Sequence, residues 1–327
     1  MSRGRYIGIG LVIIVAIFLA SGIGATDAGS LWSYLSGGIS TDQREILTSI
    51  RLPRIGTALL AGFLIGIAGA VMQRTFASPL AEPTLLGTTA AAALGSVIAL
   101  LLGARSSSPS TTALGAFLSA LVISLLTIRL DMKTRVRGSQ LIIVGIAGAA
   151  LLNGIIALIS ALAGDEEIRA TSFWSSGTLA YADQESALVL LVVTALTLFV
   201  IPKLRNTLDL FVLDDIQLTL AGRSSIKLKI GALVLVSLSV AATTSTIGAV
   251  AFLGLAAPYV SRYLFGNSMK LALIGSGVTG AFLLLVSDTV ARSIAAPNEL
   301  PISVVTSIIG APFLFLLVIG KKGKRDA

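Results

Sequence analysis

The sequence predicts an all-α, polytopic membrane protein with about ten transmembrane helices. Of its 327 residues, 55% are hydrophobic and 12% are charged, whereas soluble domains carry about 25% charged residues. The mean hydropathy of +0.94 agrees, because so little polar surface cannot cover a water-soluble globule. The apolar runs are long and unbroken, which is typical of helices and not of the alternating strands of a barrel. The 33 glycines favour close packing of helices inside a bilayer.

Ten apolar stretches approach the length of about 20 residues that a helix needs to cross a membrane. They are 6–25, 55–74, 86–103, 111–129, 139–163, 186–202, 228–246, 247–265, 270–292 and 302–320. Together they predict a single transmembrane domain over residues 1–327. Pro258 interrupts the eighth stretch and the polar Thr243–Ser245 precede it, so a short or broken helix is expected there. The first stretch is expected to stay as a helix and not to be cleaved as a signal peptide, because it is long and many more follow.

Basic residues divide unevenly between the predicted loops. With the amino terminus in the cytoplasm and the spans alternating, 18 of the 24 Lys and Arg residues fall inside and 6 outside. Of the 16 acidic residues, 6 fall inside and 10 outside. This bias predicts both termini in the cytoplasm and a multi-pass protein of the cytoplasmic membrane, in contact with membrane lipid. It also explains the net charge of +8 without a nucleic-acid partner.

The absent residue types argue against enzymatic chemistry. The chain has no Cys and no His, which removes thiolate chemistry and the commonest general base and metal ligand. No metal site, cofactor or catalytic residue is therefore predicted. The sequence also has no Gly-x-x-x-x-Gly-Lys-Ser/Thr phosphate loop, so a separate subunit must hydrolyse ATP if ATP drives this protein.

The second span begins with a basic motif and continues with regularly spaced glycines. Arg51-Leu52-Pro53-Arg54 opens it from the predicted outer side. Gly62, Gly66 and Gly69 then lie four and three residues apart, which places them on one face of a helix. Two interpretations stay open: tight packing against another helix, and a helix that runs through the centre of a bundle.

A segment rich in proline follows the second span. Ser78 to Gly87 contains Pro79 and Pro83, which end the span on the inner side and turn the chain toward the third span. A plain connecting turn would explain both prolines. Glu82, however, lies close to the membrane, where a carboxylate is costly unless it is paired or hydrated.

The inner loop 203–229 contains an amphipathic pattern. Leu213, Ile216 and Leu220 recur at helical spacing, and Gly222 suits a helix C-cap. The pattern predicts a short helix on the cytoplasmic side. It fits a docking site for a partner and an interfacial helix without one equally well.

Two further segments stand out toward the carboxyl terminus. One is Gly248–Arg262, and the other combines Ser287–Arg292 with Glu299–Ser303. Asp288 and Arg292 are four residues apart and can pair at the outer end of the ninth span.

These five segments, in this order, resemble the FecCD family of ABC-transporter permeases, which includes importers of ferric siderophores, haem and vitamin B12. The resemblance covers about residues 45–320. It rests on the motifs RLPR (51–54), PLAEPxLLG (79–87), GAVAFLGLxxPxxxR (248–262) and a final run. That run comprises Asp288, Ala291, Arg292, Glu299, Leu300, Pro301, Thr306, Gly310, Pro312, Phe313, Phe315, Leu316 and Leu317.

The resemblance implies partners on both sides of the membrane. They are a second permease subunit, identical or different, two cytoplasmic ATP-binding subunits, and an external substrate-binding protein. The residues implied to dock the binding protein are Arg51, Arg54 and Arg292, since Arg offers a bidentate fork to carboxylates. Those implied to couple to the ATPases are Leu213, Asp214, Asp215, Leu220, Gly222 and Arg223. The implied inner gate lies at Ser78, Pro79 and Leu80.

The sequence departs from the family pattern at several of these positions. The family usually has Arg-Asn before Pro-Leu-Ala, where this chain has Ala77-Ser78, and His where it has Tyr259. In the coupling segment a usual Gly is Asp214 and a usual Ala is Leu218. These differences bear on the gate and on the fit to the ATPase, and are compatible with a divergent subgroup or one half of a heterodimer.

The expected function is therefore that of a permease subunit in an ATP-driven importer working by alternating access. A ferric siderophore delivered by an external binding protein is the expected substrate, and haem or cobalamin are the alternatives. A secondary transporter driven by an ion gradient is disfavoured because the middles of the spans carry almost no carboxylates. A membrane enzyme is disfavoured by the lack of His and Cys.

Overall fold

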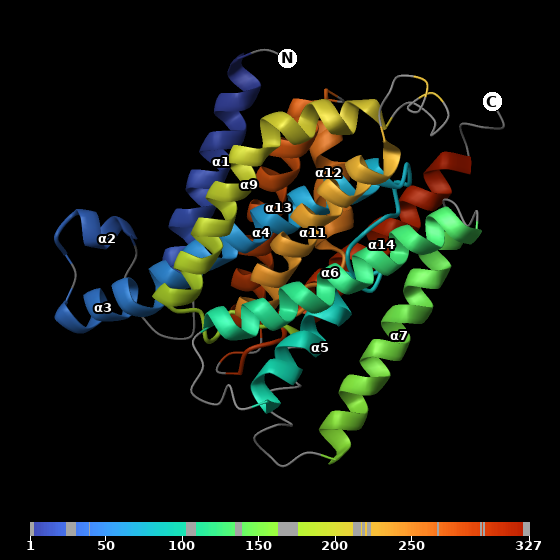
Figure 1. Cartoon of the computed structure of the whole chain (residues 1–327). Helices are drawn as coiled ribbons and strands as arrows, with labels where there is room; N and C mark the ends of the chain where they lie inside the picture. Colours follow the sequence, from blue (N-terminus) through green and yellow to red (C-terminus); the bar gives the residue numbers. More distant parts are fainter. Residues whose placement is uncertain are drawn as a thin grey trace.

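Helices make up most of the chain in the computed structural model (Figure 1). The structure describes residues 3–23, 31–38, 40–102, 109–134, 139–162, 176–211, 217, 220, 224–266, 268–294, 296 and 298–322. Within these ranges every regular element is a helix, which confirms the predicted all-α class.

The helices follow one another along the chain with two irregular interruptions in the body of the bundle. They are α1 (Arg3–Gly22), α2 (Leu31–Leu35), α3 (Thr41–Ile46), the π-helical turn η1 (Leu47–Arg51), α4 (Leu52–Thr75), α5 (Thr88–Leu101), α6 (Pro109–Thr134), α7 (Ser139–Leu162), α9 (Gln184–Leu210), α11 (Ser225–Ile247), α12 (Leu253–Phe265), α13 (Met269–Ile294) and α14 (Ile302–Lys322). A helix occupies each of the ten ranges predicted to span the membrane.

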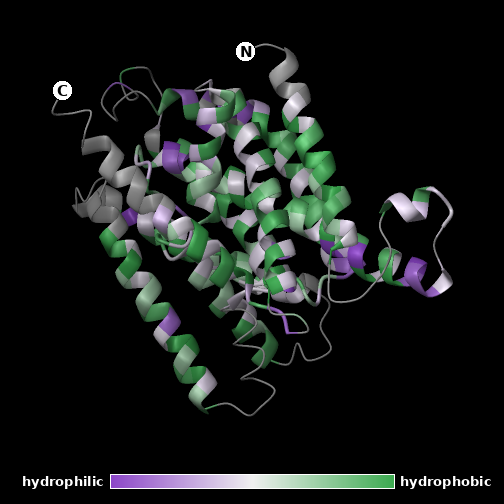
Figure 2. Cartoon of the chain, turned by 180° about the vertical axis from the view of Figure 1, so that it is seen from behind, coloured by the Kyte–Doolittle hydropathy of each residue, from purple (hydrophilic) through white to green (hydrophobic). Residues whose placement is uncertain are grey.

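Several of these helices have the length and composition of membrane spans. Among the described residues, five helical stretches are long and apolar enough to cross a bilayer: Thr41–Thr75, Ile143–Leu162, Gln184–Lys203, Ile226–Ile247 and Leu271–Ile294. Figure 2 shows hydrophobic residues along most of the helices, with hydrophilic residues concentrated near helix ends. The start of α1 and the end of α14 both lie toward the top of Figure 1. The exact set of spans and the cytoplasmic position of both termini stay predictions.

α4 is the central helix of the bundle. Seventeen of its 24 residues are buried, and it packs against α9, α11, α12 and α13. A methyl group on Gly62 or Gly66 would collide with the backbone of α13, and one on Gly69 would collide with the carbonyl of Gly254 in α12. Both interpretations of the glycine face therefore hold. The glycines allow tight packing, and this close backbone contact allows other helices to surround α4 at the centre of the bundle.

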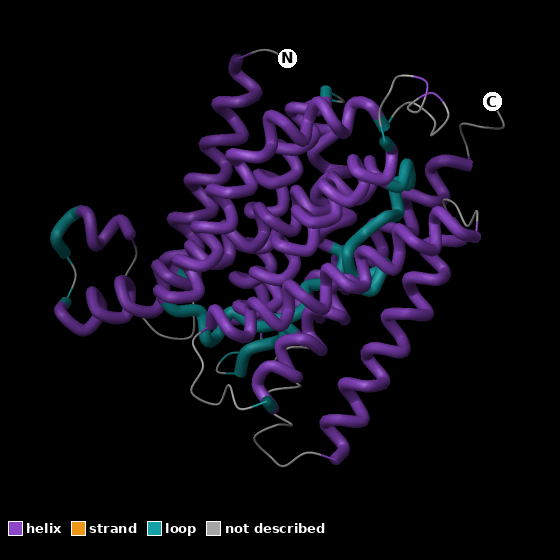
Figure 3. The backbone as a smooth tube through the Cα atoms, viewed as in Figure 1, coloured by secondary structure: helices purple, strands orange, loops and turns teal. Residues whose placement is uncertain are grey.

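α5 and α12 are too short to cross a hydrocarbon core alone. They have 14 and 13 residues, and a helix rises about 1.5 Å per residue against a core about 30 Å thick. Irregular backbone precedes each of them, at 76–87 and 248–252. Figure 3 shows the loop between α4 and α5 returning from the upper right into the body of the bundle.

The short helix expected in the eighth span is confirmed, but it begins six residues later than the predicted range 247–265. Gly248 and Phe252 both adopt positive φ, of 74° and 61°, and this ends α11 and turns the chain before α12 starts at Leu253. Positive φ at a bulky residue such as Phe252 is uncommon and holds only where its surroundings enforce it.

Candidate functional site

The predicted outer end of the bundle carries a buried cluster of charged side chains. Arg54, at the start of α4, donates from Nη2 to Oδ1 of Asp288 at 2.7 Å and from Nε to the same oxygen at 3.0 Å. It also donates from Nη1 and Nη2 to the two carboxylate oxygens of Glu299, at 2.7 and 3.0 Å. The guanidinium fork thus joins α4 to α13 and to the segment before α14.

Two more arginines attach the end of α1 to this cluster. Arg51 donates from Nη1 to the carbonyl of Ser21, and Arg292 donates from Nη2 to the carbonyl of Ala20. Both carbonyls lie in the last turn of α1, where the helix dipole is negative and attracts cations. We call Arg51, Arg54, Arg292, Asp288 and Glu299 the outer cluster.

The structure brings the three predicted docking arginines together, although it does not test docking itself. All three are buried in the single chain, with exposed fractions of 5–8%. Asp288 and Arg292 form the expected pair four residues apart at 3.6 Å, but Arg54 is the closer partner of Asp288. Sequence reasoning did not anticipate Glu299 as a partner of Arg54, because 245 residues separate them.

The predicted gate residues form the turn that follows α4. Ala77 has a φ of 47°, and Ser78 returns its N–H to the carbonyl of Gln73 at 3.1 Å. Ser78 is buried, while Pro79 is exposed and Leu80 half-buried. The Ser78 hydroxyl accepts from the Leu80 N–H at 3.4 Å, so the turn is braced by its own side chain. Its role as a gate stays a prediction.

Glu82 connects this turn to the start of α12. Glu82 is 1% exposed, and its carboxylate lies against the backbone N–H groups of Phe252, Gly254 and Leu255 and the Thr84 hydroxyl. These N–H groups belong to a helix amino terminus, where the dipole favours negative charge. The sequence indicated that a carboxylate here needs pairing or hydration. In the structure it lies against the amino terminus of α12, about 170 residues further along the chain.

The inner end of α4 is tied to two other helices. Gln73 accepts from Nη1 of Arg262 in α12 at 2.8 Å, and Arg74 donates from Nε to the carbonyl of Leu208 in α9 at 3.3 Å. The Arg262 guanidinium also lies over the ring of Tyr259 at 6.0 Å, so the tyrosine that departs from the family pattern has a defined contact.

The predicted coupling segment lies almost wholly outside the described residues. This holds for Leu213, Asp214, Asp215, Gly222 and Arg223. Leu220 is described; it is helical and 84% exposed. The segment begins three residues after α9 ends at Leu210. Arg74 of α4 contacts the Leu208 carbonyl in the last turn of α9, so α4 is linked to the helix that leads into this segment.

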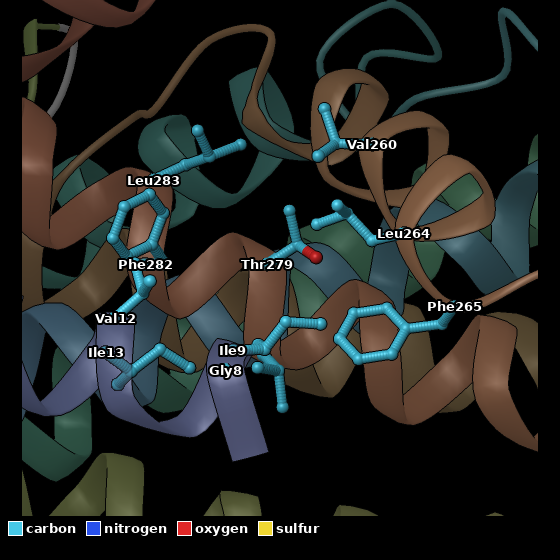
Figure 4. A pocket seen from close by; sticks show the side chains of 11 residues that line it. Gly8, Ile9, Val12, Ile13, Val260, Leu264, Phe265, Thr279, Phe282 and Leu283 are labelled. Carbon is cyan, nitrogen blue, oxygen red and sulfur yellow. The ribbon is translucent and has the colours of Figure 1, made fainter. Parts of the chain in front are cut away.

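One pocket of the described structure does not suit a charged substrate. It is a groove of ≈ 480 Å³ between α1, α12 and α13, and Figure 4 shows that Thr279 supplies the only polar side chain among those labelled there. Other apolar residues of α1, among them Leu11 and Val15, are also exposed in the single chain. This is the character of a lipid-facing groove. Among the described residues, no group of three or more Asp and Glu is placed to hold a metal ion.

Comparison with known proteins assigns the family. A sequence model described as the FecCD transport family matches residues 10–320. The chain belongs to the FecCD transport family. Its relatives include the hemin transport permease HmuU of Yersinia pestis, 30% identical over 97% of both chains. Another is an iron chelatin transport permease of Helicobacter pylori strain 26695, 32% identical over 85% of this chain and 83% of that one.

A solved structure supports the same assignment. A chain of a metal-chelate-type ABC transporter in an inward-facing conformation matches with a TM-score of 0.83 and 26% identity, over 98% of this chain and all of that one. The FecCD chain described here is thus a multi-pass membrane permease of an ABC importer and not itself an enzyme. FecCD permeases work with separate ATPase and binding-protein subunits.

Proposed function

We propose that this permease carries a ferric siderophore, delivered to its outer cluster by an external binding protein. The observation that supports docking is that three arginines gather at the predicted outer end. Arginine side chains attract an acidic surface and bind its carboxylates. The iron chelatin and metal-chelate names of the relatives support the choice of substrate.

Glu299 is the accessible member of the outer cluster. Its side chain is 34% exposed, compared with 10% for Arg54. A carboxylate of the binding protein would approach from this side and compete with Glu299 for the Arg54 guanidinium. Docking would then loosen the contacts that tie the segment before α14 to α4, which is a direct way for an external partner to act on the helices.

The inner end of the bundle offers a corresponding route by which the ATPases would move α4. Movement of the predicted coupling segment 213–223 would reach α9, and the contact between Leu208 and Arg74 would pass it to α4. The turn containing Ser78, Pro79 and Leu80 follows directly after this helix. ATP binding on one side and docking on the other would therefore both act on α4, as alternating access requires.

Haem is the second candidate substrate. The hemin permease HmuU matches over 97% of both chains, and a transport subunit needs no imidazole ligand to pass haem on. Uptake into cells that lack their own importers, measured for ferric siderophores, haem and cobalamin with the cognate ATPase and binding protein, decides between them. Preference for haem or cobalamin would overturn the siderophore proposal. Uptake that survives an inactive ATPase would overturn ATP-driven import.

Docking is tested at Glu299. Glu299→Gln removes the competing negative charge while keeping a side chain of the same size, so we expect the binding protein to bind the reconstituted transporter several-fold more tightly. Glu185→Gln is the matched control, because Glu185 is an exposed carboxylate at the start of α9 on the same predicted outer side. Unchanged affinity for Glu299→Gln, or the same gain for both variants, would contradict docking at the cluster.

A further inference from the structure

One oxygen of the buried Glu82 carboxylate has no partner. The carboxylate lies against three backbone N–H groups and the Thr84 hydroxyl, and Oε2 has no hydrogen-bond partner among the residues that the structure describes. The side chain is 1% exposed, so bulk water does not reach this oxygen. A buried acceptor without a partner is costly, and such groups are usually satisfied by ordered water.

Glu82 also lines a small cavity. The other polar residues that line it are Thr84 of the segment before α5, Thr89 of α5, and Thr243 and Thr244 of α11, and the rest of its wall is mostly apolar. Its volume of ≈ 10 Å³ is about that of a single water probe, the smallest space that holds one water molecule. Polar side chains from three separate elements therefore converge on a space of this size.

Thr243 can accept a hydrogen bond in this cavity. Its hydroxyl proton is used within α11, where Oγ1 donates to the carbonyls of Ser239 and Val240, each at 3.0 Å. The lone pairs of Oγ1 remain for a donor. The carboxylate oxygen also needs a donor, so Glu82 and Thr243 cannot satisfy each other directly. A molecule with two O–H groups placed between them satisfies both.

We propose that one ordered water molecule occupies this cavity and donates to Oε2 of Glu82 and to Oγ1 of Thr243. The hydroxyl of Thr89 or Thr244 completes its coordination by donating to it. The water joins α11 to the segment 76–87, which Glu82 already joins to α12. These three parts, separated in sequence by up to about 170 residues, are thereby held together beside the turn of Ser78, Pro79 and Leu80, which is the predicted gate.

Water fits the site better than a cation does. The amino terminus of α12 and the hydroxyl of Thr84 already offset part of the cost of burying the charge of Glu82. Cations such as Ca²⁺ bind six or more oxygens, whereas Glu82 is the only carboxylate among the residues lining this cavity.

A double-mutant cycle tests the bridge. Thr243→Val removes the acceptor without changing side-chain shape much, and Glu82→Met removes Oε2. Because the two side chains do not bond directly, their effects on the Tm of the purified transporter complex should couple only through the water: the double variant should lose several degrees less than the sum of the single variants. Additive losses would overturn the proposal.

Thr246→Val is the matched control. Thr246 is buried on the same helix and donates to the carbonyls of Ala242 and Thr243, as Thr243 does to its own preceding turn, but it does not line the cavity. We expect Thr246→Val to lower the Tm less than Thr243→Val and to add independently to Glu82→Met. Equal losses for the two threonine variants would contradict the bridge, even if Glu82→Met fails to fold.

Direct observation gives a second test. A structure of the transporter complex at a resolution that shows ordered water should contain one density peak within hydrogen-bond distance of Glu82 Oε2 and Thr243 Oγ1. The Tm should be the same in NaCl and in choline chloride at equal ionic strength. An empty cavity, or a Tm that rises with sodium in the parent chain and not in Glu82→Met, would overturn the assignment to water.

Discussion

Two buried carboxylates of this permease are stabilised in opposite ways. Asp288 is 0% exposed and is neutralised by the guanidinium groups of Arg54 and Arg292. Glu82 is 1% exposed and has no arginine or lysine partner among its hydrogen bonds; the amino terminus of α12 and one hydroxyl stabilise it. The first carboxylate is held by charges, whereas the second is held by backbone dipoles.

The difference follows from what each region must contact. The outer cluster lies at the predicted external end, where we propose that its arginines attract an acidic partner. Glu82 lies in the body of the bundle beside the turn predicted to form the gate, where a full positive charge would be expensive to bury. The amino terminus of α12 provides stabilisation there without adding an ion. It also ties the position of α12 to the segment 76–87, which carries Glu82.

The largest effect is expected from Arg54→Leu. This change leaves Asp288 buried, with only the more distant Arg292 nearby, and uncompensated buried charges of this kind cost about 3–5 kcal/mol of folding stability. The measurement is the loss of Tm and of folded yield for the purified complex. Arg54→Lys keeps the charge but not the fork, so its loss should be smaller. A small loss for Arg54→Leu would show that Asp288 does not depend on charge pairing.

Glu82→Ala is expected to cost less, about 2–3 kcal/mol, because it leaves polar N–H groups unsatisfied but no buried charge without a partner. Denaturant or thermal unfolding of the complex, compared directly with Arg54→Leu, measures the difference. We also expect this variant to impair transport while binding-protein affinity is unchanged, since the outer cluster is untouched. An equal or greater loss than for Arg54→Leu would break the distinction between the two carboxylates.

Gly69→Ala should produce the smallest of these losses, about 2 kcal/mol at most, through overpacking. The added methyl group meets the carbonyl of Gly254, so it pushes the start of α12 away from α4 and from Glu82. Gly56→Ala is the control on the same helix, because a methyl group there has no neighbour within 4 Å and should be neutral or slightly stabilising. If both alanine variants unfold at the same Tm, close approach of α12 is not required.

Local features of the sequence predicted several parts of the structure. The apolar runs predicted where helices occur, Pro258 and the polar residues before it predicted a short eighth helix, and glycine spacing predicted the packing face of α4. The start of α12 was placed too early, because the positive φ of Phe252 has no sequence signature. Residue spacing also predicted the pair of Asp288 and Arg292, which the structure contains as the longer contact.

By itself the sequence determined the membrane as solvent, the positions of the helices and the family, because hydrophobic runs, helix breakers and ordered motifs act over a few residues. Only the tertiary structure decided that Arg54 pairs with both Asp288 and Glu299, and that Glu82 lies against the amino terminus of a helix far along the chain. These partners are 234, 245 and about 170 residues apart. No local pattern encodes them, since packing of α4 against α12 and α13 brings together side chains whose spacing in sequence is arbitrary.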